Sequence, residues 1–359
     1  MEVCTAIMKG LQDADDSMDI IFFPMADGGD GFAEVLKYYT GTDTVKIGSV
    51  DALGRPIHCA YELNLADNFA IIELATCSGL AMLEIHERDP LLTSTYGTGL
   101  QVQHAIQHGV KKILLGIGGS ATNDAGTGIL SALGFVFLDS DGQTLEPSGK
   151  ILSQVSEILI PESLPNIHFD IACDVNNPLY GPEGAALVFA EQKGATHQEA
   201  KLLDEGLRNF ASVVMQQTGL NISSFPGAGA AGGIAAGLSA FLSVSIIEGT
   251  QLVLSASKIE KSLQGANVII TGEGKIDHQS SRGKTISAVA AMGARNKIPV
   301  IAFCGKLELD EPEWRKLGLM NVFEIADKST SEVDSIRHAY ELLLKKSKSL
   351  VHSPPFLNR

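Results

Sequence analysis

The chain has 359 residues, of which 45% are hydrophobic, and 42 acidic side chains against 27 basic ones give a formal net charge of −15. This length is sufficient for two domains of ordinary size or one large one. The charge argues against polyanionic partners, so we expect neither nucleic acid nor an acidic membrane surface to bind.

The sequence also lacks the usual signals for a membrane or for export. It contains no uninterrupted apolar run of about 18 residues, and its N-terminus lacks the basic and then apolar pattern of a secretion signal. Its five cysteines are scattered and form no CxxC pair, which argues against a disulfide framework or a zinc cluster. We therefore expect a soluble cytoplasmic protein.

In chain order, apolar runs of strand length alternate with amphipathic helical patterns. The runs and the helical patterns that follow them are 19–26 with 32–39, 111–119 with 125–135, 266–274 with 285–295, and 299–306 with 311–318. Such alternation is typical of parallel strands covered by helices.

Two other stretches, 45–64 and 69–79, instead have the pattern of consecutive strands joined by turns. They predict a second, mixed sheet that is inserted after the first unit. We place boundaries near Asp51 and Ser262, which divides the chain into residues 1–50, 51–261 and 262–359.

Four glycine-rich loops follow a predicted strand or precede a predicted helix. They are residues 26–31, 116–128, 227–237 and 271–285. In open parallel sheets, ligands bind beyond the carboxyl ends of the strands, where glycine lets the backbone approach a phosphate group. The same glycines would also serve tight turns and close helix packing, so both interpretations stand.

Known nucleotide fingerprints fit these loops only in part. The "RGKT" segment is no Walker A motif, because His278 stands where the first glycine is required. The pattern Gly116-x-Gly118-x-x-Ala121 follows a predicted strand and precedes Asp139 by about 20 residues. It supports an alternative function, that of an NAD(P)-dependent oxidoreductase.

Acidic residues are found just past several of the apolar runs. These are Asp27, Asp30, Asp124, Asp174, Glu273 and Asp277. Carboxylates gathered at strand ends suit a magnesium–phosphate site, where they hold the cation or accept a proton from an attacking hydroxyl group. The alternative interpretation is that each of them caps the helix that follows.

Five motifs together resemble the bacterial glycerate kinase type-1 family. They lie at residues 24–36, 97–134, 172–195, 226–238 and 268–285, in the order that the family has, and the similarity extends through nearly the whole chain. The resemblance implies transfer of the γ-phosphoryl group of ATP to D-glycerate with Mg²⁺, in a cleft between domains. The expected product is 2-phosphoglycerate, with 3-phosphoglycerate as the alternative.

The resemblance also implies a fold of the α/β class with two α/β domains. One would be flavodoxin-like, with three layers and a mainly parallel sheet built from both chain ends, and the other would be an inserted mixed α/β domain. Family members usually begin with a short apolar strand and an "APDSFK"-like loop, which do not precede "MEVCTAIMKG" here. Either the start codon is assigned downstream of the true one, which the otherwise intact pattern favours, or residues 1–50 lack the usual first strand and its lysine. If that start is genuine, a non-catalytic metabolite-binding homologue is a further alternative.

Site residues follow from the motifs and the resemblance. Asp174 is the leading candidate for the base or a metal ligand, Asp124 shares these roles, and Lys284 is expected to be catalytic. The residues expected to bind substrate or phosphate are Asp27, Gly28, Gly29, Asp30, Gly118, Gly119, Ser120, Asn123, Arg55, Glu273, Asp277 and Arg282. The expected partners are small molecules, and a homodimer is compatible with the sequence.

Overall fold

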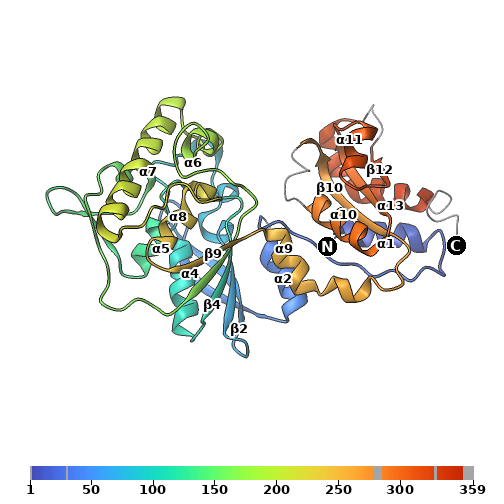
Figure 1. Ribbon diagram of the computed structural model, residues 1–359, viewed down its shortest axis with the longest axis horizontal. Helices are drawn as coiled ribbons and strands as arrows, with labels where there is room; N and C mark the ends of the chain where they lie inside the picture. Colours follow the sequence, from blue (N-terminus) through green and yellow to red (C-terminus); the bar gives the residue numbers. More distant parts are fainter. Residues whose placement is uncertain (1, 30, 279–284, 327–329, 351–359) are drawn as a thin grey trace. The chain divides into compact units, whose positions relative to one another are not determined.

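The computed structural model describes residues 2–29, 31–278, 285–326 and 330–350 (Figure 1). Contacts divide the chain into two compact units: unit 1 comprises Met1–Ala26 with Val253–Arg359, and unit 2 comprises Asp27–Leu252. The boundaries that we placed near Asp51 and Ser262 differ from these, because the helix and strand that precede Asp51 pack within unit 2.

Unit 2 is built on a six-stranded mixed sheet with the order β1-β2-β3-β4-β8-β9. Pairing is antiparallel from β1 to β3 and parallel from β3 to β9. The strands are β1 (Asp43–Val50), β2 (Pro56–Asn64), β3 (Phe69–Glu73), β4 (Lys112–Gly116), β8 (His168–Ala172) and β9 (Ser243–Ile247).

The register of the parallel strands aligns their carboxyl ends. Glu73 pairs with Gly116, Gly116 with Ala172, and Ala172 with Ile247. The loops that follow β3, β4, β8 and β9 therefore begin side by side at one edge of the sheet. Ligands bind at this edge in open parallel sheets.

Helices and a small second sheet complete unit 2. The helices are α2 (Phe32–Thr40), α3 (Ala75–Ser78), α4 (Tyr96–Gln107), α5 (Thr127–Ala132), α6 (Ala185–Phe189), α7 (His197–Thr218) and α8 (Ile234–Ser239), and α9 (Gly249–Ser257) spans the boundary to unit 1. The short 3-10 helices are η1 (Leu80–Met82), η2 (Ile85–Glu87), η3 (Gly149–Ser153), η4 (Glu191–Lys193) and η5 (Ala230–Gly232).

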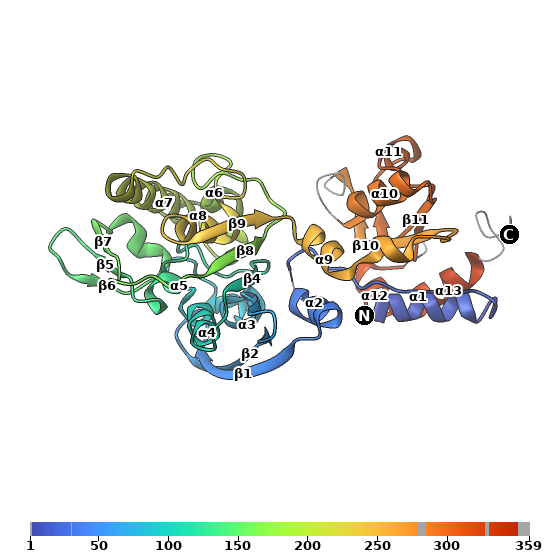
Figure 2. The same cartoon turned by 60° about the horizontal axis from the view of Figure 1, so that its bottom comes forward.

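The second sheet has the order β6-β5-β7 and is antiparallel throughout. Its strands are β5 (Val136–Leu138), β6 (Thr144–Leu145) and β7 (Glu157–Leu159), which Figure 2 shows beside one another at the left. Its Phe137 packs with Phe210 of α7 in the same apolar core that contains Ile113 and Phe169 of the main sheet. The small sheet is thus part of the core of unit 2.

Local sequence explains the longest helix. A capping box starts α7. The side chain of Thr196 accepts a hydrogen bond from the backbone N–H of Glu199, and the side chain of Glu199 accepts one from the backbone N–H of Thr196. Gly219, in the left-handed region with φ of 74°, ends it.

Unit 1 contains a parallel three-stranded sheet with the order β10-β11-β12 among its described residues. The strands are β10 (Ile269–Ile276), β11 (Val300–Leu307) and β12 (Asn321–Glu324). The helices are α1 (Glu2–Gln12), η6 (Ile259–Ser262), α10 (Thr285–Asn296), α11 (Glu311–Lys316), α12 (Glu332–Arg337) and α13 (Ala339–Leu350).

Alternation along β11 places apolar side chains on both faces of this sheet. Ala302 and Cys304 belong to one core cluster with residues of α10 and α11, whereas Ile301 and Phe303 belong to another with residues of α1 and α13. The sheet of unit 1 therefore has helices on both faces, and α1 packs against α13.

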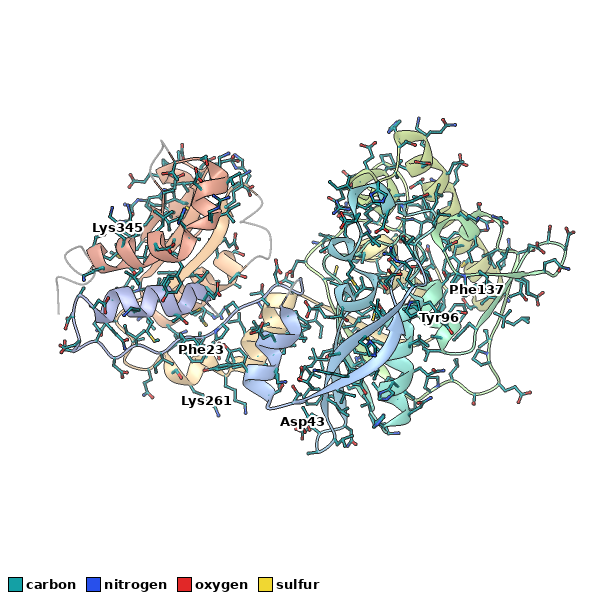
Figure 3. All side chains as sticks on the ribbon, turned by 180° about the vertical axis from the view of Figure 1, so that it is seen from behind. Phe23, Asp43, Tyr96, Phe137, Lys261 and Lys345 are labelled. Carbon is teal, nitrogen blue, oxygen red and sulfur yellow. The ribbon has the colours of Figure 1, made fainter. Side chains whose placement is uncertain are left out.

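The structure confirms the α/β class and most of the predicted elements. Two segments differ from the prediction. The stretch 69–79, predicted as strand, is strand only to Glu73 and continues as α3. Residues 19–26, also predicted as a strand, form no regular element. Ile20 and Phe23 (Figure 3) pack instead against the apolar clusters of unit 1, and Pro24 has no N–H group to donate to a neighbouring strand. The flavodoxin-like assignment of unit 1 stays a prediction.

Among the described residues, no helix is both long and apolar enough to cross a membrane.

Candidate functional site

The loop that precedes α2 contacts the loop at the carboxyl end of β4 in unit 2. Gly118, in the loop after β4, donates from its backbone N–H to the carbonyl oxygen of Gly28 at 3.1 Å. The loop that begins at Asp27 therefore packs directly on the loop that follows β4.

Glycine is required where these loops meet. A Cβ atom on Gly118 would lie 2.5 Å from the Cα atom of Gly29, and one on Gly249 would lie 2.2 Å from the carbonyl oxygen of Asp27. Gly28 has φ of 95°, and a Cβ atom there would lie 2.9 Å from the Cβ atom of Ala172. These contacts explain the glycines by close packing of backbone, whether or not a ligand binds.

Two predicted carboxylates lie at this edge of the sheet. The Oδ1 atom of Asp174, in the loop after β8, accepts from the backbone N–H of Gly249 at 3.0 Å. Asp27 is exposed, and its Oδ1 atom accepts from Gly29 at 3.2 Å. Because Gly249 touches both Asp27 and Asp174, the structure brings these two residues together.

Glu73, which the sequence analysis did not select, holds the first loop to the sheet. Its Oε1 atom accepts from the N–H of Gly31 at 2.7 Å, and its Oε2 atom accepts from Ala33 at 3.4 Å. The N-terminus of α2 thus receives the carboxylate that its dipole favours from the end of β3. The sequence signal that could have indicated Glu73 is its position as an acidic residue at the end of an apolar strand.

Asp124 lies behind the loop and is completely buried. Its carboxylate accepts four hydrogen bonds: from the backbone and the hydroxyl group of Thr95, both at 2.8 Å, and from the N–H groups of Gly126 and Gly128 at 3.1 and 3.2 Å. Burial raises the pKa of Asp124, while these donors act in the opposite direction. This geometry favours the capping interpretation of Asp124 over that of a metal ligand.

Buried polar groups surround the same turn. The Nζ atom of Lys193, at the end of η4, donates to the hydroxyl oxygen of Ser120 and to the carbonyl oxygen of Thr122, both at 2.7 Å. Within the described residues, the side-chain oxygen and nitrogen of Asn123 have no hydrogen-bond partner, although Asn123 is only 1% exposed. Ser120 and Asn123 were among the predicted residues, but Lys193 was not, since a single lysine in "FAEQKGA" carries no recognisable pattern.

Arg55, a predicted source of positive charge, is held between two carboxylates. Its guanidinium group forms ion pairs with Asp51 and Glu87. Hydrogen bonds to both carboxylates raise the pKa of Arg55. The structure therefore gives Arg55 a role in fixing the β1–β2 turn against η2.

Two other predicted carboxylates belong to unit 1. The Oε1 atom of Glu273 on β10 accepts from the N–H of Ile286 in the first turn of α10 at 3.2 Å. Asp277 lies 3.4 Å from the ammonium group of Lys275. Three further predicted site residues, Asp30, Arg282 and Lys284, lie outside the described residues.

The donor set fits magnesium better than a softer metal. In the part of the chain that the structure describes, no three side chains of His, Cys, Asp or Glu are grouped so as to hold a metal ion. Magnesium is usually held by one or two carboxylates together with water and substrate phosphates. Asp174 and Asp27 provide carboxylates of this kind at the sheet edge.

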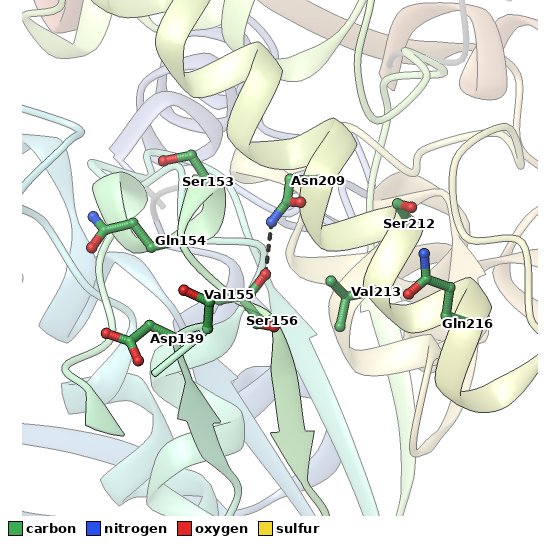
Figure 4. A pocket seen from close by; sticks show the side chains of 10 residues that line it. Asp139, Ser153, Gln154, Val155, Ser156, Asn209, Ser212, Val213 and Gln216 are labelled. Atoms are coloured by element: carbon green, nitrogen blue, oxygen red, sulfur yellow. Dashed lines mark hydrogen bonds between the residues drawn. The ribbon is translucent and has the colours of Figure 1, made fainter. Parts of the chain in front are cut away.

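A shallow pocket lies elsewhere in unit 2, between η3 and α7 (Figure 4). The Nδ2 atom of Asn209 donates to the carbonyl oxygens of Leu152 and Val155 at 2.8 and 2.9 Å, which ties α7 to η3. Asp139 lines this pocket, and its Oδ1 atom accepts from the backbone of Asp141 and Gln143.

The dinucleotide hypothesis loses its structural context. The strand before Gly116 is present as β4, but α5 begins only at Thr127, well beyond Ala121. Asp139 follows β5 of the small antiparallel sheet instead of the next parallel strand. The fingerprint requires a helix that starts at the glycine turn and an acidic residue after the second parallel strand, so the Gly116-x-Gly118-x-x-Ala121 turn is no such fingerprint.

Comparisons with known proteins agree on one family. A model described as the glycerate kinase family matches residues 1–353. A glycerate kinase of Bacillus cereus is 36% identical over 98% of this chain and 93% of its own length. A glycerate 2-kinase of Escherichia coli K12 is 34% identical over 97% of this chain and 92% of its own.

A crystal structure of a proposed glycerate kinase 2 from Salmonella typhimurium LT2 also resembles this chain. The two structures superpose with a TM-score of 0.82 at 36% sequence identity. The superposition includes 97% of this chain and 92% of the Salmonella chain. The similarity in sequence and in fold thus extends over almost all of each chain.

Proposed function

The chain belongs to the glycerate kinase family, and from this membership we propose that it transfers the γ-phosphoryl group of ATP to a hydroxyl group of D-glycerate. We propose the 2-hydroxyl group as the acceptor, which would yield 2-phosphoglycerate, because a relative of similar length is named a glycerate 2-kinase. The observation that carries the proposal within the fold is the meeting of the Asp27 loop, the Gly118 loop and Asp174 at the carboxyl ends of parallel strands.

Asp174 is the residue that we propose as the base or as a metal ligand. It is half-buried, it stands two residues after the end of β8, and the backbone N–H of Gly249 donates to one of its oxygen atoms. A carboxylate in this position is suited to accept the proton of the substrate hydroxyl group or to hold a hard cation. Asp27, which packs against the same glycine, is the second carboxylate of the proposal.

Magnesium would supply neutralisation of the charge that develops on the phosphoryl oxygens. Asp174 and Asp27 would hold it together with the substrate phosphates. The metal-binding role that we expected for Asp124 is not part of this proposal, because backbone and hydroxyl donors already occupy its oxygens. Asp124 would instead fix the loop that carries Gly118, Gly119 and Ser120.

The remaining roles keep their predicted residues. Backbone groups of Gly118, Gly119 and Ser120 would contact the phosphate or the glycerate. Glu273 and Asp277 of unit 1 would contribute carboxylates, and Lys284 and Arg282 would contribute positive charge.

The function is tested by incubating the purified full chain with D-glycerate, ATP and Mg²⁺. We expect release of ADP that depends on glycerate, and phosphorus NMR of the product should identify 2-phosphoglycerate. Absence of ADP release from folded protein would refute the kinase proposal, whereas 3-phosphoglycerate as the product would refute only the choice of hydroxyl group.

The role of Asp174 is tested by Asp174→Asn, with Asp139→Asn as the matched control in the pocket of Figure 4. We expect Asp174→Asn to lower kcat by about 100-fold or more, since a positioned base contributes roughly 10²–10⁴ in rate. The control should keep its rate. Turnover at the unsubstituted level in Asp174→Asn would remove Asp174 from the mechanism.

A further inference from the structure

Lys193 is buried at the candidate site and has no role in the mechanism proposed above. It is 3% exposed, and its ammonium group donates to Ser120 and to the carbonyl oxygen of Thr122. Burial of a lysine is costly unless its charge is used by neighbouring groups. Ser120 stands 73 residues earlier in the chain, so the fold itself brings this contact about.

The contact with Lys193 fixes the direction in which Ser120 donates. An ammonium group has only donors, and a serine hydroxyl group has one donor and two acceptor positions. Because Ser120 accepts from Lys193, its own hydrogen must point to a different acceptor. Ser120 directly follows Gly118 and Gly119, which carry the loop at the strand ends.

A second observation, the polar groups of the same turn that have no partner in the described part of the chain, points to a polar ligand beside Ser120. Asn123 is buried, yet within the described residues both polar atoms of its side chain lack a hydrogen-bond partner, as does the hydroxyl group of Thr122. Buried polar groups in folded proteins are nearly always paired with protein, water or ligand. This turn therefore has hydrogen-bonding capacity that its own residues do not use.

The contacts of Lys193 differ from those of Arg55, the other described cationic side chain that we considered in unit 2. Arg55 is engaged by Asp51 and Glu87, whereas Lys193 contacts the glycine loop itself. In a chain with a net charge of −15, a local positive charge favours the binding of an anionic substrate. A single ammonium group matches a single carboxylate.

We propose that Lys193 is a positioning residue that presents Ser120 as a hydrogen-bond donor to the carboxylate of the acceptor substrate, with Asn123 completing this anion subsite. The inference rests on the proposed function, since it names the group of D-glycerate that this part of the site recognises. The phosphates of ATP would be bound by other groups.

The ionisation of Lys193 provides a readout that a purely structural residue would not give. Burial lowers the pKa of Lys193 to about 7, and the negative charge of Asp124 opposes this shift. Other ionisable residues also lie near Lys193. The backbone of Arg88 packs against Gly194, the next residue in the chain, and Glu191 and His197 stand two residues before and four residues after Lys193. Since kcat/KM reports ionisations of the free enzyme, kcat/KM for glycerate should fall as pH rises through about 7.

The test compares Lys193→Met with Lys201→Met, a control on the exposed side of α7. We expect Lys193→Met to raise the KM for D-glycerate at least tenfold, to leave the KM for ATP within twofold, and to lose the ionisation near pH 7. Calorimetry with D-glycerate alone should show that Lys193→Met binds glycerate more weakly than the unsubstituted protein does. Circular dichroism establishes that the variant is folded. Ser120→Ala, which keeps the contact of Lys193 with Thr122, should raise the KM for glycerate severalfold and serves if Lys193→Met does not fold.

Glyceramide, in which an amide replaces the carboxylate, identifies the recognised group. The unsubstituted protein should prefer D-glycerate strongly, and Lys193→Met should lose most of that preference. An unchanged KM for glycerate in a folded Lys193→Met would overturn the inference, and so would a raised KM for ATP in its place. An inactive unsubstituted protein would instead refute the proposed function, and the two failures are therefore distinguishable.

Discussion

Asp124 and Lys193 show how two buried charged residues can support one loop in different ways. The carboxylate of Asp124 is surrounded by donors from Thr95, Gly126 and Gly128, so its hydrogen bonds are made within the protein. The hydroxyl group of Thr95 also accepts from the N–H of Ile129, which leaves its hydrogen for Asp124. These hydrogen bonds favour the ionised carboxylate against the burial that raises the pKa of Asp124, and they connect the turn to the start of α4 and α5.

Asp124→Asn should therefore lower stability more than it changes substrate recognition. The amide places an NH₂ group where the carboxylate accepted from backbone donors, so at least one buried donor loses its partner. We expect the free energy of unfolding to fall by about 2–4 kcal/mol, as measured by urea denaturation. Asp141→Asn, on an exposed turn, is the control; equal stability of the two variants would contradict the supporting role of Asp124.

The residues of the candidate site that stand in recognisable local patterns could be proposed from the sequence. Asp27, Gly118 and Asp174 each follow a strand or belong to a glycine-rich turn, and the fold places them at one edge of a sheet. Lys193 could not be found in this way, because its importance arises from a contact between η4 and a loop far earlier in the chain.

At the scale of elements, the contact of Gly249 with the Asp27 loop links the beginning of α9 to the site. Gly249 stands at the first position of α9, directly against the backbone of Asp27, and its N–H binds Asp174. Gly249, which has no side chain, thus holds the carboxylate of Asp174 and packs against the backbone of Asp27.

Gly249→Ala should disturb this junction. Its Cβ atom would lie 2.2 Å from the carbonyl oxygen of Asp27, which forces the backbone of one of the two segments to move. We expect kcat/KM to fall by about tenfold or more, because small displacements of catalytic groups cost about 10²-fold at the upper end. Steady-state kinetics and thermal unfolding measure the effect.

The control for this substitution is Gly48→Ala on β1, where a Cβ atom would meet nothing within 4 Å. It should leave both the kinetics and the unfolding temperature close to those of the unsubstituted protein. If Gly249→Ala behaved in the same way, the junction would tolerate a side chain and would not set the geometry of the site.

Most elements could be predicted from the periodicity of the sequence, and the misses have physical causes. The apolar run of β4 and the helical pattern of α5 are each visible locally. Residues 19–26 are equally apolar, yet a strand also needs a pairing partner, which local sequence does not reveal. The compact units divide at Ala26 and not near Asp51 for a related reason, since pairing of β1 with β2 joins that strand to unit 2.

At the scale of the whole molecule, the chain has separate apolar cores in its two units. Phe210 of α7 lies in the core of unit 2, and Leu343 of α13 lies in that of unit 1. Trp314, the single tryptophan of the sequence, is 7% exposed within a core cluster of unit 1. Its fluorescence should therefore report the unfolding of unit 1.

Phe210→Ala should destabilise unit 2 selectively. Removal of a buried phenylalanine side chain costs about 3–5 kcal/mol, so the midpoint of unfolding followed by circular dichroism should fall while that followed by tryptophan fluorescence stays constant. Leu343→Ala should have the opposite effect and lower the fluorescence midpoint. Coincident shifts of both signals in both variants would mean that the two units unfold as one.

The packing of α1 against α13 also has a consequence for biosynthesis. The ribosome makes α1 before unit 2 and α13 only after the whole of unit 2, an interval on the order of tens of seconds at ordinary elongation rates. During that time Ala6 and Leu11, which are buried in the finished protein, lack the helix that covers them, while unit 2 already has all of its own residues. We therefore expect the nascent chain to fold from its middle outward, and α1 to be the segment that a chaperone would meet exposed.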